Sequence, residues 1–358
     1  MNNLFNQYKH VHYAYLSGEH EEIPLGELKA VLEAENTLYN TIFIDEQLYL
    51  FTSPNINYQR IINRVAYTKE LGLVLAYTHD ITLESILELL DHAEWDFLQG
   101  KRFIVKAKHI RGFYSKDIPT PIVERAIGKK ILEIIQYKAK VTPTTPEIII
   151  RVLFSRSIVV IGIIQSKLDT KYFLRMRPRK RPFFHPGVLE PKISRAFVNF
   201  SRIRRGETFL DPFCGTGGFL IEACNIGAYT IGYDIRKLMS YGSLQNILYY
   251  NLSDRAIILQ ADATHMPIKD ESIDAIGTDP PYGRASSTHG RSLKELIRMF
   301  LEESSRVMKK HRYVCFATPH TIDPLEYIEM YGFKLIERYT MKVHRGLTRV
   351  IYIIKKEK

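Results

Sequence analysis

Residues 209–223, FLDPFCGTGGFLIEA, contain the pattern from which the architecture is predicted. This stretch reads as a hydrophobic strand that ends at Asp211, a turn that contains Gly215, Gly217 and Gly218, and a helix that follows the turn. Glycines allow the backbone to approach a ligand closely. The spacing D-x-x-x-G-x-G differs from the G-x-G-x-x-G of dinucleotide-binding loops, and no Lys-Ser or Lys-Thr follows as in a P-loop. The motif predicts a βα unit with a ligand-binding loop, although a plain tight turn has the same pattern.

Strands and helices alternate from Glu207 onward, which predicts a mostly parallel sheet with helices on both faces. The last two β-rich runs, Phe333 to Val343 and Leu347 to Lys355, are joined by a turn at Arg345-Gly346 and should pair as antiparallel neighbours. A parallel sheet that ends in such a hairpin favours a class I methyltransferase over a dinucleotide dehydrogenase. The predicted strands of the parallel part are 207–212, 228–234, 256–261, 273–278 and 312–318.

Acidic residues follow successive predicted strands. Asp234 closes the strand after the glycine loop, where a carboxylate is placed to accept the two hydroxyls of an adenosine ribose. Asp262 ends the following strand, where its side chain or the Ala263 backbone is placed to meet an adenine. Each acid alone would equally suit a helix cap. Together with Asp211 they indicate one adenosine-containing ligand across the carboxyl edge of the sheet.

The motif TDPPYG, residues 278–283, directly follows the strand SIDAIG. Two prolines stiffen this loop and fix Asp279 at the sheet edge. The Asp279 carboxylate and the Pro280 carbonyl can accept the two hydrogens of an exocyclic base amine and aim its lone pair at a methyl donor. Tyr282 can stack on the base for about 1–3 kcal/mol. The motif therefore predicts methylation of an amine, against the plainer alternative of a rigid proline turn.

The ordered set of Asp211 to Gly218, Asp234, Asp262 and Asp279 to Gly283 resembles S-adenosylmethionine-dependent amino-methyltransferases with a D/N/S-P-P-Y/F motif. The segment HPGVLEPKISRAFVN, residues 185–199, is similar to the THUMP-containing RNA guanine N2-methyltransferases. DPPYGRAS, in which Arg284 and Ser286 continue the motif, is similar to the archaeal enzymes that methylate guanosine at position 10 of tRNA. Ala285 stands where many relatives have Ser, so the residue-by-residue correspondence stops at Arg284.

The resemblance implies an α/β fold: an N-terminal ferredoxin-like α+β domain and a THUMP domain, followed by a class I Rossmann-like methyltransferase domain with a terminal antiparallel hairpin. The expected domains are 1–55, 58–165 (THUMP, RNA-binding) and 185–358 (methyltransferase), with a basic linker at 166–184. The expected catalytic residues are Asp279, Pro280 and Tyr282. The expected S-adenosyl-L-methionine-binding residues are His185, Pro186, Asp211, Cys214, Gly215, Gly217, Asp234, Ile235, Asp262, Ala263 and Asp279.

The charge is distributed unevenly along the chain. Residues 1–100 have a net charge of −10, residues 101–205 carry 25 Lys and Arg against 6 Asp and Glu for a net +19, and residues 206–358 have +2. Lys and Arg gain affinity for nucleic acids by releasing counterions from phosphates. The middle third therefore predicts tRNA binding, with a solvated basic surface as the alternative. The predicted RNA-binding residues are Lys101, Arg102, Lys106, Lys108, Arg111, Arg175, Arg177, Arg179, Lys180 and Arg181.

The first 170 residues read as two small units of mixed strands and helices. The first has strands at 9–17 and 37–51 around a helix at 25–35, and the turn cluster SPNIN, residues 53–57, marks its end. The second has a helix from Tyr58, strands at 73–77 and 103–107, helices at 82–90 and from Pro121 to Tyr137, and a hairpin formed by 147–154 and 157–165. The proline-rich basic stretch 171–187 predicts a partly extended linker, because prolines disrupt a helix interior.

Several classes of protein and of site are disfavoured. The longest aliphatic run, Ile158 to Ile164, is far shorter than the roughly 20 residues of a membrane span, and residues 1–10 have no apolar signal core, so we expect a cytoplasmic protein. The cysteines form no C-x-x-C pair, so we expect free thiols and no metal. His185 and Cys214 are expected to be structural rather than catalytic. Arg345, Thr348 and Arg349 either contact RNA or lie on a solvated surface.

Alternative functions remain open from the sequence: the same chemistry on another tRNA position, on rRNA or on DNA, or a non-catalytic RNA-binding adaptor. The expected partner is tRNA and the expected oligomeric state is a monomer, and the sequence leaves open whether a small activator subunit is needed in addition. Sequence does not distinguish the addition of one methyl group from the addition of two.

Overall fold

The computed structural model describes residues 10–110, 119–282, 292–344 and 346–357. The chain forms two compact units. The first contains 1–25, 37–63 and 68–168, and the second contains 26–36, 64–67 and 169–358. The predicted residues Arg111, Gly283 to Ser286 and Arg345 lie outside the described parts of the chain.

The first unit is built on an eight-stranded sheet in the order β2-β3-β1-β4-β8-β7-β5-β6. Strand β1 pairs antiparallel with β4, so strands from both predicted amino-terminal units share one sheet. The predicted hairpin of 147–154 and 157–165 is confirmed as β7 and β8. The strands are β1 (Val11–Leu16), β2 (Asn40–Asp45), β3 (Leu48–Thr52), β4 (Thr68–Thr78), β5 (Arg102–His109), β6 (Lys140–Val141), β7 (Ile148–Phe154) and β8 (Val159–Lys167).

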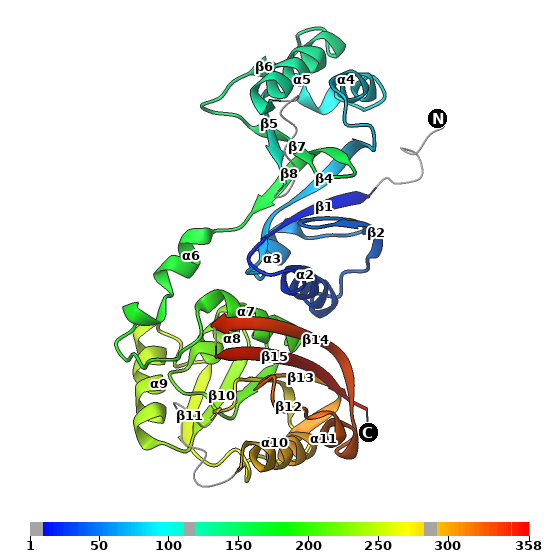
Figure 1. Ribbon diagram of the computed structural model, residues 1–358. Helices are drawn as coiled ribbons and strands as arrows, with labels where there is room; N and C mark the ends of the chain where they lie inside the picture. Colours follow the sequence, from blue (N-terminus) through cyan, green and yellow to red (C-terminus); the bar gives the residue numbers. More distant parts are fainter. Residues whose placement is uncertain (1–9, 111–118, 283–291, 345, 358) are drawn as a thin grey trace. The chain divides into compact units, whose positions relative to one another are not determined.

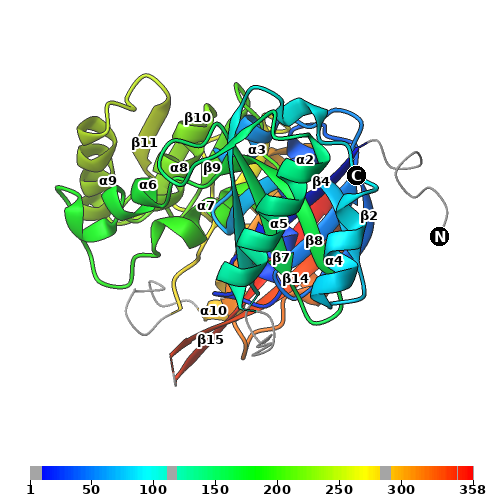
Figure 2. The ribbon, with the colours of Figure 1, turned by 90° about the horizontal axis from the view of Figure 1, so that it is seen from above.

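Helices α4 (Leu83–Leu90) and α5 (Thr120–Ile134) lie side by side against this sheet (Figures 1 and 2). Their apolar residues pack with Phe103, Val105 and Phe154 in one buried core. The Thr82 hydroxyl caps α4 by accepting from the Ser85 N–H. Short helix α3 (Tyr58–Ile62) begins at the predicted position, with Asn57 as its cap, and a 3₁₀ turn covers Asp96–Leu98.

The second unit is built on a seven-stranded sheet in the order β11-β10-β9-β12-β13-β15-β14. The first five strands are parallel, and the terminal hairpin joins them antiparallel, as predicted. This is the Rossmann-like arrangement expected from the sequence. The strands are β9 (Thr208–Asp211), β10 (Tyr229–Asp234), β11 (Ala256–Gln260), β12 (Ile273–Thr278), β13 (Met308–Pro319), β14 (Phe333–His344) and β15 (Leu347–Lys356).

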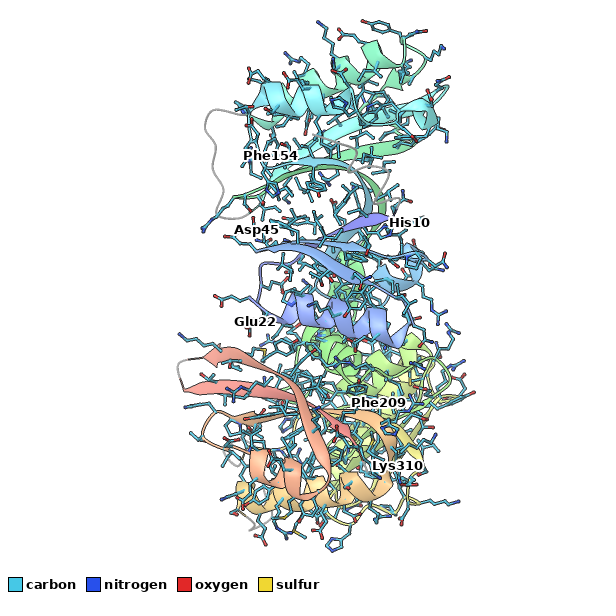
Figure 3. The ribbon with its side chains drawn as sticks, turned by 90° about the vertical axis from the view of Figure 1, so that its right-hand side faces the viewer. His10, Glu22, Asp45, Phe154, Phe209 and Lys310 are labelled. Atoms are coloured by element: carbon cyan, nitrogen blue, oxygen red, sulfur yellow. The ribbon has the colours of Figure 1, made fainter. Side chains whose placement is uncertain are left out.

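Helices cover both faces of the second sheet. Figure 1 shows α7 and α8 on one face and α10 and α11 on the other. Phe209, labelled in Figure 3, is fully buried in this unit, whereas Lys310 is exposed. The helices are α6 (Thr170–Arg175), α7 (Pro191–Phe200), α8 (Gly218–Ile226), α9 (Lys237–Tyr249), α10 (Leu293–Val307) and α11 (Leu325–Met330).

Two predicted elements differ from the structure. The single strand predicted at 37–51 is a hairpin, because Glu46 adopts a left-handed φ of 46° and turns the chain between β2 and β3. Part of the predicted extended linker is helix α6, which begins where the Asp169 carboxylate accepts from the Lys171 N–H at 2.9 Å. The prolines begin only at Pro178, which starts a 3₁₀ turn (Pro178–Lys180), so they leave α6 intact.

The second unit includes two short segments from the amino-terminal third of the chain. One is residues 26–36, which form most of α2 (Ile23–Ala34), and the other is Arg64–Tyr67. The buried Glu27 carboxylate accepts from the N–H groups of Ala66 and Tyr67 and from the Asn199 amide, each at 2.8 Å. Helix α7, which carries Asn199, is therefore packed with residues that are distant in sequence.

In the described ranges, no helix combines the length and the apolar character needed to cross a membrane. The three cysteines, Cys214, Cys224 and Cys315, are buried and free.

Candidate active site

Four acidic residues lie at one edge of the second sheet, where four neighbouring parallel strands end. Asp211 ends β9, Asp234 ends β10, Asp262 comes two residues after β11, and Asp279 directly follows β12. These strands are consecutive in the order β11-β10-β9-β12. The structure therefore brings the acidic series found in the sequence to a single edge, the position where open α/β sheets bind ligands.

The glycine loop after β9 is held by Asp234. The Gly215 N–H donates to Asp234 Oδ2 at 3.2 Å, and the Arg236 N–H donates to Asp234 Oδ1 at 2.9 Å. Gly217 has a φ of 80°, and a Cβ at this position would lie 2.5 Å from the Ser243 hydroxyl oxygen, so the loop requires glycine there. Arg236 Nε also donates to Asp234 Oδ1, at 3.3 Å, so three of the about four lone-pair sites of this carboxylate are occupied and one remains for a further donor.

Asp211 is fully buried behind this loop. Its Oδ1 accepts from the Thr278 hydroxyl at 2.6 Å and from the Phe213 N–H at 3.2 Å. Its Oδ2 has no hydrogen-bond partner among the described residues. Burial raises the pKa of Asp211 to about 8. The site thus contains a carboxylate oxygen that lacks a donor, and a ligand cation would supply one.

The remaining predicted cofactor residues surround the same loop and edge. Asp262 Oδ1 accepts from the Thr264 N–H and hydroxyl at 2.9 and 2.8 Å, and Ala263 is buried beside it. Ile235, next to Asp234, is 37% exposed despite being apolar. His185 is partly exposed, with its Nδ1 at 2.8 Å from the Pro186 carbonyl oxygen.

Within the second unit, the segment before His185 packs against α9 through Asn246. The Asn246 amide donates to the carbonyls of Phe183 and Thr216, and its Oδ1 accepts from the Phe183 N–H. Phe183 also fills the space where a side chain at Gly242 would lie. Asn246 therefore links Phe183 to Thr216 of the glycine loop.

The Asp279 carboxylate is bound on both oxygens. The Tyr282 hydroxyl donates a short hydrogen bond to Asp279 Oδ1, and Arg349 Nη2 donates to Asp279 Oδ2 at 2.9 Å. Arg349 Nε also donates to the Tyr282 hydroxyl oxygen at 2.8 Å, which closes a three-membered network. Burial raises the pKa of Asp279, whereas Arg349 and the Tyr282 hydrogen bond act in the opposite direction. Pro280 is buried directly after Asp279.

Two arginines lie differently from what the sequence indicated. Arg349 was expected on a surface, but it is 5% exposed and paired with Asp279. Arg181 was expected to contact RNA, but it is also 5% exposed and donates to the Met176 carbonyl at 3.1 Å. Arg181 is therefore not an exposed cation, and its contact with RNA stays a prediction.

The other described residues of the predicted RNA-binding set are exposed. Several have weak partners at the surface: Arg175 pairs with Asp169 at 3.2 Å, Arg177 with Glu190 at 3.9 Å, and the Arg179 guanidinium lies 5.9 Å from the Phe184 ring centre. Exposed pairs of this kind contribute little stability and exchange readily for phosphate. The exposed set comprises Lys101, Arg102, Lys106, Lys108, Arg175, Arg177, Arg179 and Lys180.

Covalent and metal chemistry have no support in the described residues. Burial raises the pKa of the Cys214 thiol well above its usual range, so the reactive thiolate is disfavoured. Within 10–110, 119–282, 292–344 and 346–357, no cluster of three or more His, Cys, Asp or Glu side chains is arranged to hold a metal ion.

The sequence matches known proteins along almost its whole length. Residues 178–351 match the UPF0020 family, described as an RMKL-like methyltransferase domain. The chain is 35% identical to a tRNA (guanine(10)-N2)-dimethyltransferase of Methanothermobacter thermautotrophicus over 95% of this chain and 98% of that protein. It is also 35% identical to the enzyme of the same name from Methanocaldococcus jannaschii, again over 95% and 98%.

A similar fold occurs in a solved structure. The crystal structure of TrmN from Thermus thermophilus matches 97% of this chain and 100% of that chain, with a TM-score of 0.54 and 20% sequence identity. At this identity the match shows a shared fold.

Proposed function

The chain belongs to the family of the archaeal tRNA (guanine(10)-N2)-dimethyltransferases, and on this premise we propose that it transfers methyl groups to N2 of guanosine at position 10 of tRNA. It is an S-adenosyl-L-methionine-dependent methyltransferase, as its family and fold require. The observation that carries the proposal is the Asp279-Pro280-Pro281-Tyr282 loop, which adjoins Asp211 and Asp234 at one sheet edge.

The residues at this edge fit the cofactor. Among the described residues, Asp211 Oδ2 lacks a donor, which suits the ammonium group of the methionine part, and Asp234, which accepts from three donors, keeps one lone-pair site for a ribose hydroxyl. The glycine loop allows close approach, and Ala263 and exposed Ile235 offer apolar contacts to the adenine. S-adenosyl-L-methionine supplies a methyl group on a positively charged sulfur. Asp262 and the segment at His185 and Pro186 complete the proposed pocket.

On the acceptor side, Asp279 and the Pro280 carbonyl would hold the two hydrogens of the guanine amine. This aims the nitrogen lone pair at the methyl carbon and stabilises the positive charge that develops on nitrogen. The bound cofactor would supply the methyl group and keep the electron pair of the broken C–S bond, and the Asp279 carboxylate would take the one proton that the methylated nitrogen must lose. The guanine must leave its stack to reach Asp279, and Tyr282 is placed to stack on it.

The exposed basic residues of the middle third would hold the RNA. We propose that the domains expected from the sequence share this task. A THUMP domain within 58–165 and a basic linker at 166–184 would position the tRNA, and a catalytic domain at 185–358 would transfer the methyl group. The exposed cations on β5 and around α6 support the RNA role, since counterion release favours phosphate binding.

We also propose that the protein acts in the cytoplasm as a monomer assisted by a small activator subunit. Helix α9 supports such a partner, because its Leu238, Tyr241, Leu248 and Tyr249 side chains are all more than half exposed. Contiguous exposed apolar surface of this kind is typical of protein contacts.

The test uses the full-length protein, S-adenosyl-L-methionine and tRNA transcripts that carry either G or A at position 10. Nucleoside mass spectrometry should detect N2-methylguanosine, or its dimethyl form, only in the G10 transcript, and Asp279→Ala should abolish it. Equal methylation of the A10 transcript would assign a different target position. If neither transcript yields methylguanosine, and a parallel reaction with rRNA yields none either, the proposed function is refuted and a non-catalytic adaptor is favoured.

A further inference from the structure

Arg349 reaches the catalytic loop from the terminal hairpin. It lies on β15 in register with Pro319 of β13, whereas Thr278 at the end of β12 pairs with Phe316. Arg349 therefore sits beyond the carboxyl end of β12, where its guanidinium meets Asp279 and Tyr282. The terminal hairpin thus contributes a side chain to a site otherwise built from the parallel strands.

The guanidinium is committed to this contact. Arg349 is 5% exposed, its Nη2 bonds Asp279 Oδ2, and its Cζ lies 5.4 Å from the centre of the Tyr282 ring. A buried cation is tolerated only when paired, and here the partner is the carboxylate that would accept the target amine. This arrangement is incompatible with a phosphate contact at the surface.

The two oxygens of Asp279 have different partners. Within the described parts of the chain, Arg349 bonds Oδ2, and the neutral Tyr282 hydroxyl is the one side chain that bonds Oδ1. A hydroxyl is displaced by another neutral donor at far lower cost than a buried guanidinium. Oδ1 is consequently the oxygen that can pass from Tyr282 to an incoming amine.

We propose that Arg349 is a positioning residue, which holds Asp279 through Oδ2 in the ionised form and presents Oδ1 to the guanine amine, while Tyr282 leaves Oδ1 and stacks on the base. This inference rests on the proposed function for the identity of the amine. The role of Arg349 toward Asp279 stands on the geometry alone.

The pairing has a consequence for the pH dependence of methyl transfer. Burial raises the pKa of Asp279, and the positive charge of Arg349 opposes that rise. Among the described residues, the other titratable groups that interact with Asp279 are Tyr282, Asp211 and Cys315, and none of these three carries a positive charge. Loss of Arg349 should therefore raise the pKa of Asp279 and move the acidic limb of the rate profile to higher pH.

The first experiment measures single-turnover methyl transfer to tRNA against pH for the wild type, Arg349→Met, Arg349→Lys and Arg338→Met. Arg338 is an exposed cation on β14 of the same hairpin and serves as the matched control. On the acidic limb, the methyl-transfer rate of Arg349→Met should fall about tenfold below that of the wild type for each unit by which the pKa of Asp279 rises. The difference between the two rates should become smaller at higher pH. Arg349→Lys should lie between Arg349→Met and the wild type, and Arg338→Met should match the wild type.

A second measurement reads the carboxyl group directly, without RNA or cofactor. In protein labelled with ¹³C at the aspartate carboxyl groups, the resonance lost in Asp279→Asn identifies Asp279, and its pKa should rise in Arg349→Met. A pKa that stays within the error of the wild type in both Arg349 variants, or a uniform loss of rate at every pH, would overturn the proposal. A wild type that methylates no guanine refutes the proposed function, and the carboxyl titration then still decides the role of Arg349.

Discussion

At the scale of single residues, the strand-end acids have the same position but different surroundings. Asp211 is fully buried with one oxygen lacking a donor, Asp234 holds the glycine loop, and Asp279 is tied to Tyr282 and Arg349. The same type of side chain at the same edge of the sheet therefore has different hydrogen-bond partners, and we propose a different role for it accordingly. The first two face the proposed cofactor, and the third faces the proposed acceptor amine.

Single substitutions of Asp279 and Asp234 test these two assignments separately. Asp279→Ala should abolish methyl transfer and leave the affinity for S-adenosyl-L-methionine within a few fold, because Asp279 is assigned to the amine. Asp234→Ala should weaken cofactor affinity first, because it removes the ribose acceptor and the Gly215 hydrogen bond together. Calorimetric titration of both variants checks this, and the reverse pattern would mean that the assignments are wrong.

The raised pKa of Asp211 predicts a pH-dependent cofactor affinity. With a pKa of about 8, Asp211 is mostly protonated at pH 6, so binding a cationic ammonium group there must first release a proton. The affinity for S-adenosyl-L-methionine should rise by up to about tenfold per pH unit from pH 6 and level off near pH 8. Isothermal calorimetry across this range is the measurement. Asp211→Asn should bind more weakly and retain only the dependence due to the cofactor's own amine.

Whether the sequence predicted the position of a site residue depends on how far along the chain its partner lies. Asp211, Asp234 and Asp279 follow recognisable strands, so their common edge was predictable from alternation alone. Arg349 bonds Asp279 across 70 positions, and no local pattern marks such a partner. The burial of Arg181 was equally hidden, since the basic run around it reads as uniformly exposed.

At the scale of elements, the contact between α2 and α7 depends on one buried carboxylate. Glu27 is fully buried and accepts from three donors, and the approach of α2 also needs Gly26, where a Cβ would overlap the Tyr339 hydroxyl. Burial outweighs these hydrogen bonds and raises the pKa of Glu27 to about 7. The element is held by specific polar pairing as well as by apolar packing.

Removing that carboxylate should destabilise the second unit. Glu27→Ala leaves the N–H groups of Ala66 and Tyr67 and the Asn199 amide buried without an acceptor, at about 1–3 kcal/mol each. We expect the free energy of unfolding, measured by denaturant titration, to fall by at least about 3 kcal/mol. Glu33→Ala on the same helix is the control: its carboxylate is 40% exposed, and its buried partner Arg202 keeps its bonds to Glu337 and the Phe200 carbonyl, so this variant should cost less than Glu27→Ala. Similar losses for the two variants would contradict the importance of the Glu27 contacts.

Most elements were predictable because their hydrophobic periodicity and end signals agree. The terminal hairpin and the strand-helix order after Glu207 are examples, with α8 ending at Gly227 in a left-handed conformation. The β2-β3 turn was missed because its left-handed residue is Glu46 rather than Gly or Asn. Helix α6 was missed because the prolines that follow it dominated the local pattern.

At the scale of the whole molecule, the excess positive charge of residues 101–205 should appear as salt-dependent tRNA binding. Replacing Arg175, Arg177 and Arg179 with Ser should lower the slope of log affinity against log salt by about 2 to 3, if each residue neutralises one phosphate. Arg181 is left intact because it is buried. Filter binding at several salt concentrations provides the slopes.

The matched control removes three exposed cations from the second unit: Lys310→Ser, Lys334→Ser and Arg338→Ser. This variant has the same net charge as the first and should keep the wild-type slope. Equal slopes for the two triple variants would show that net charge, rather than the stretch around α6, governs the binding.

The two early segments in the second unit also determine when that unit can form during synthesis. Glu27 precedes its partner Asn199 by 172 residues. At about 5–20 residues per second, the ribosome needs roughly 10 to 30 s to synthesise that interval. Helix α2 therefore leaves the ribosome long before α7 exists, and Glu27 lacks its Asn199 donor throughout that interval. Glu27 and Asn199 can pair only after Asn199 has been synthesised, so the second unit cannot be completed before that point in translation.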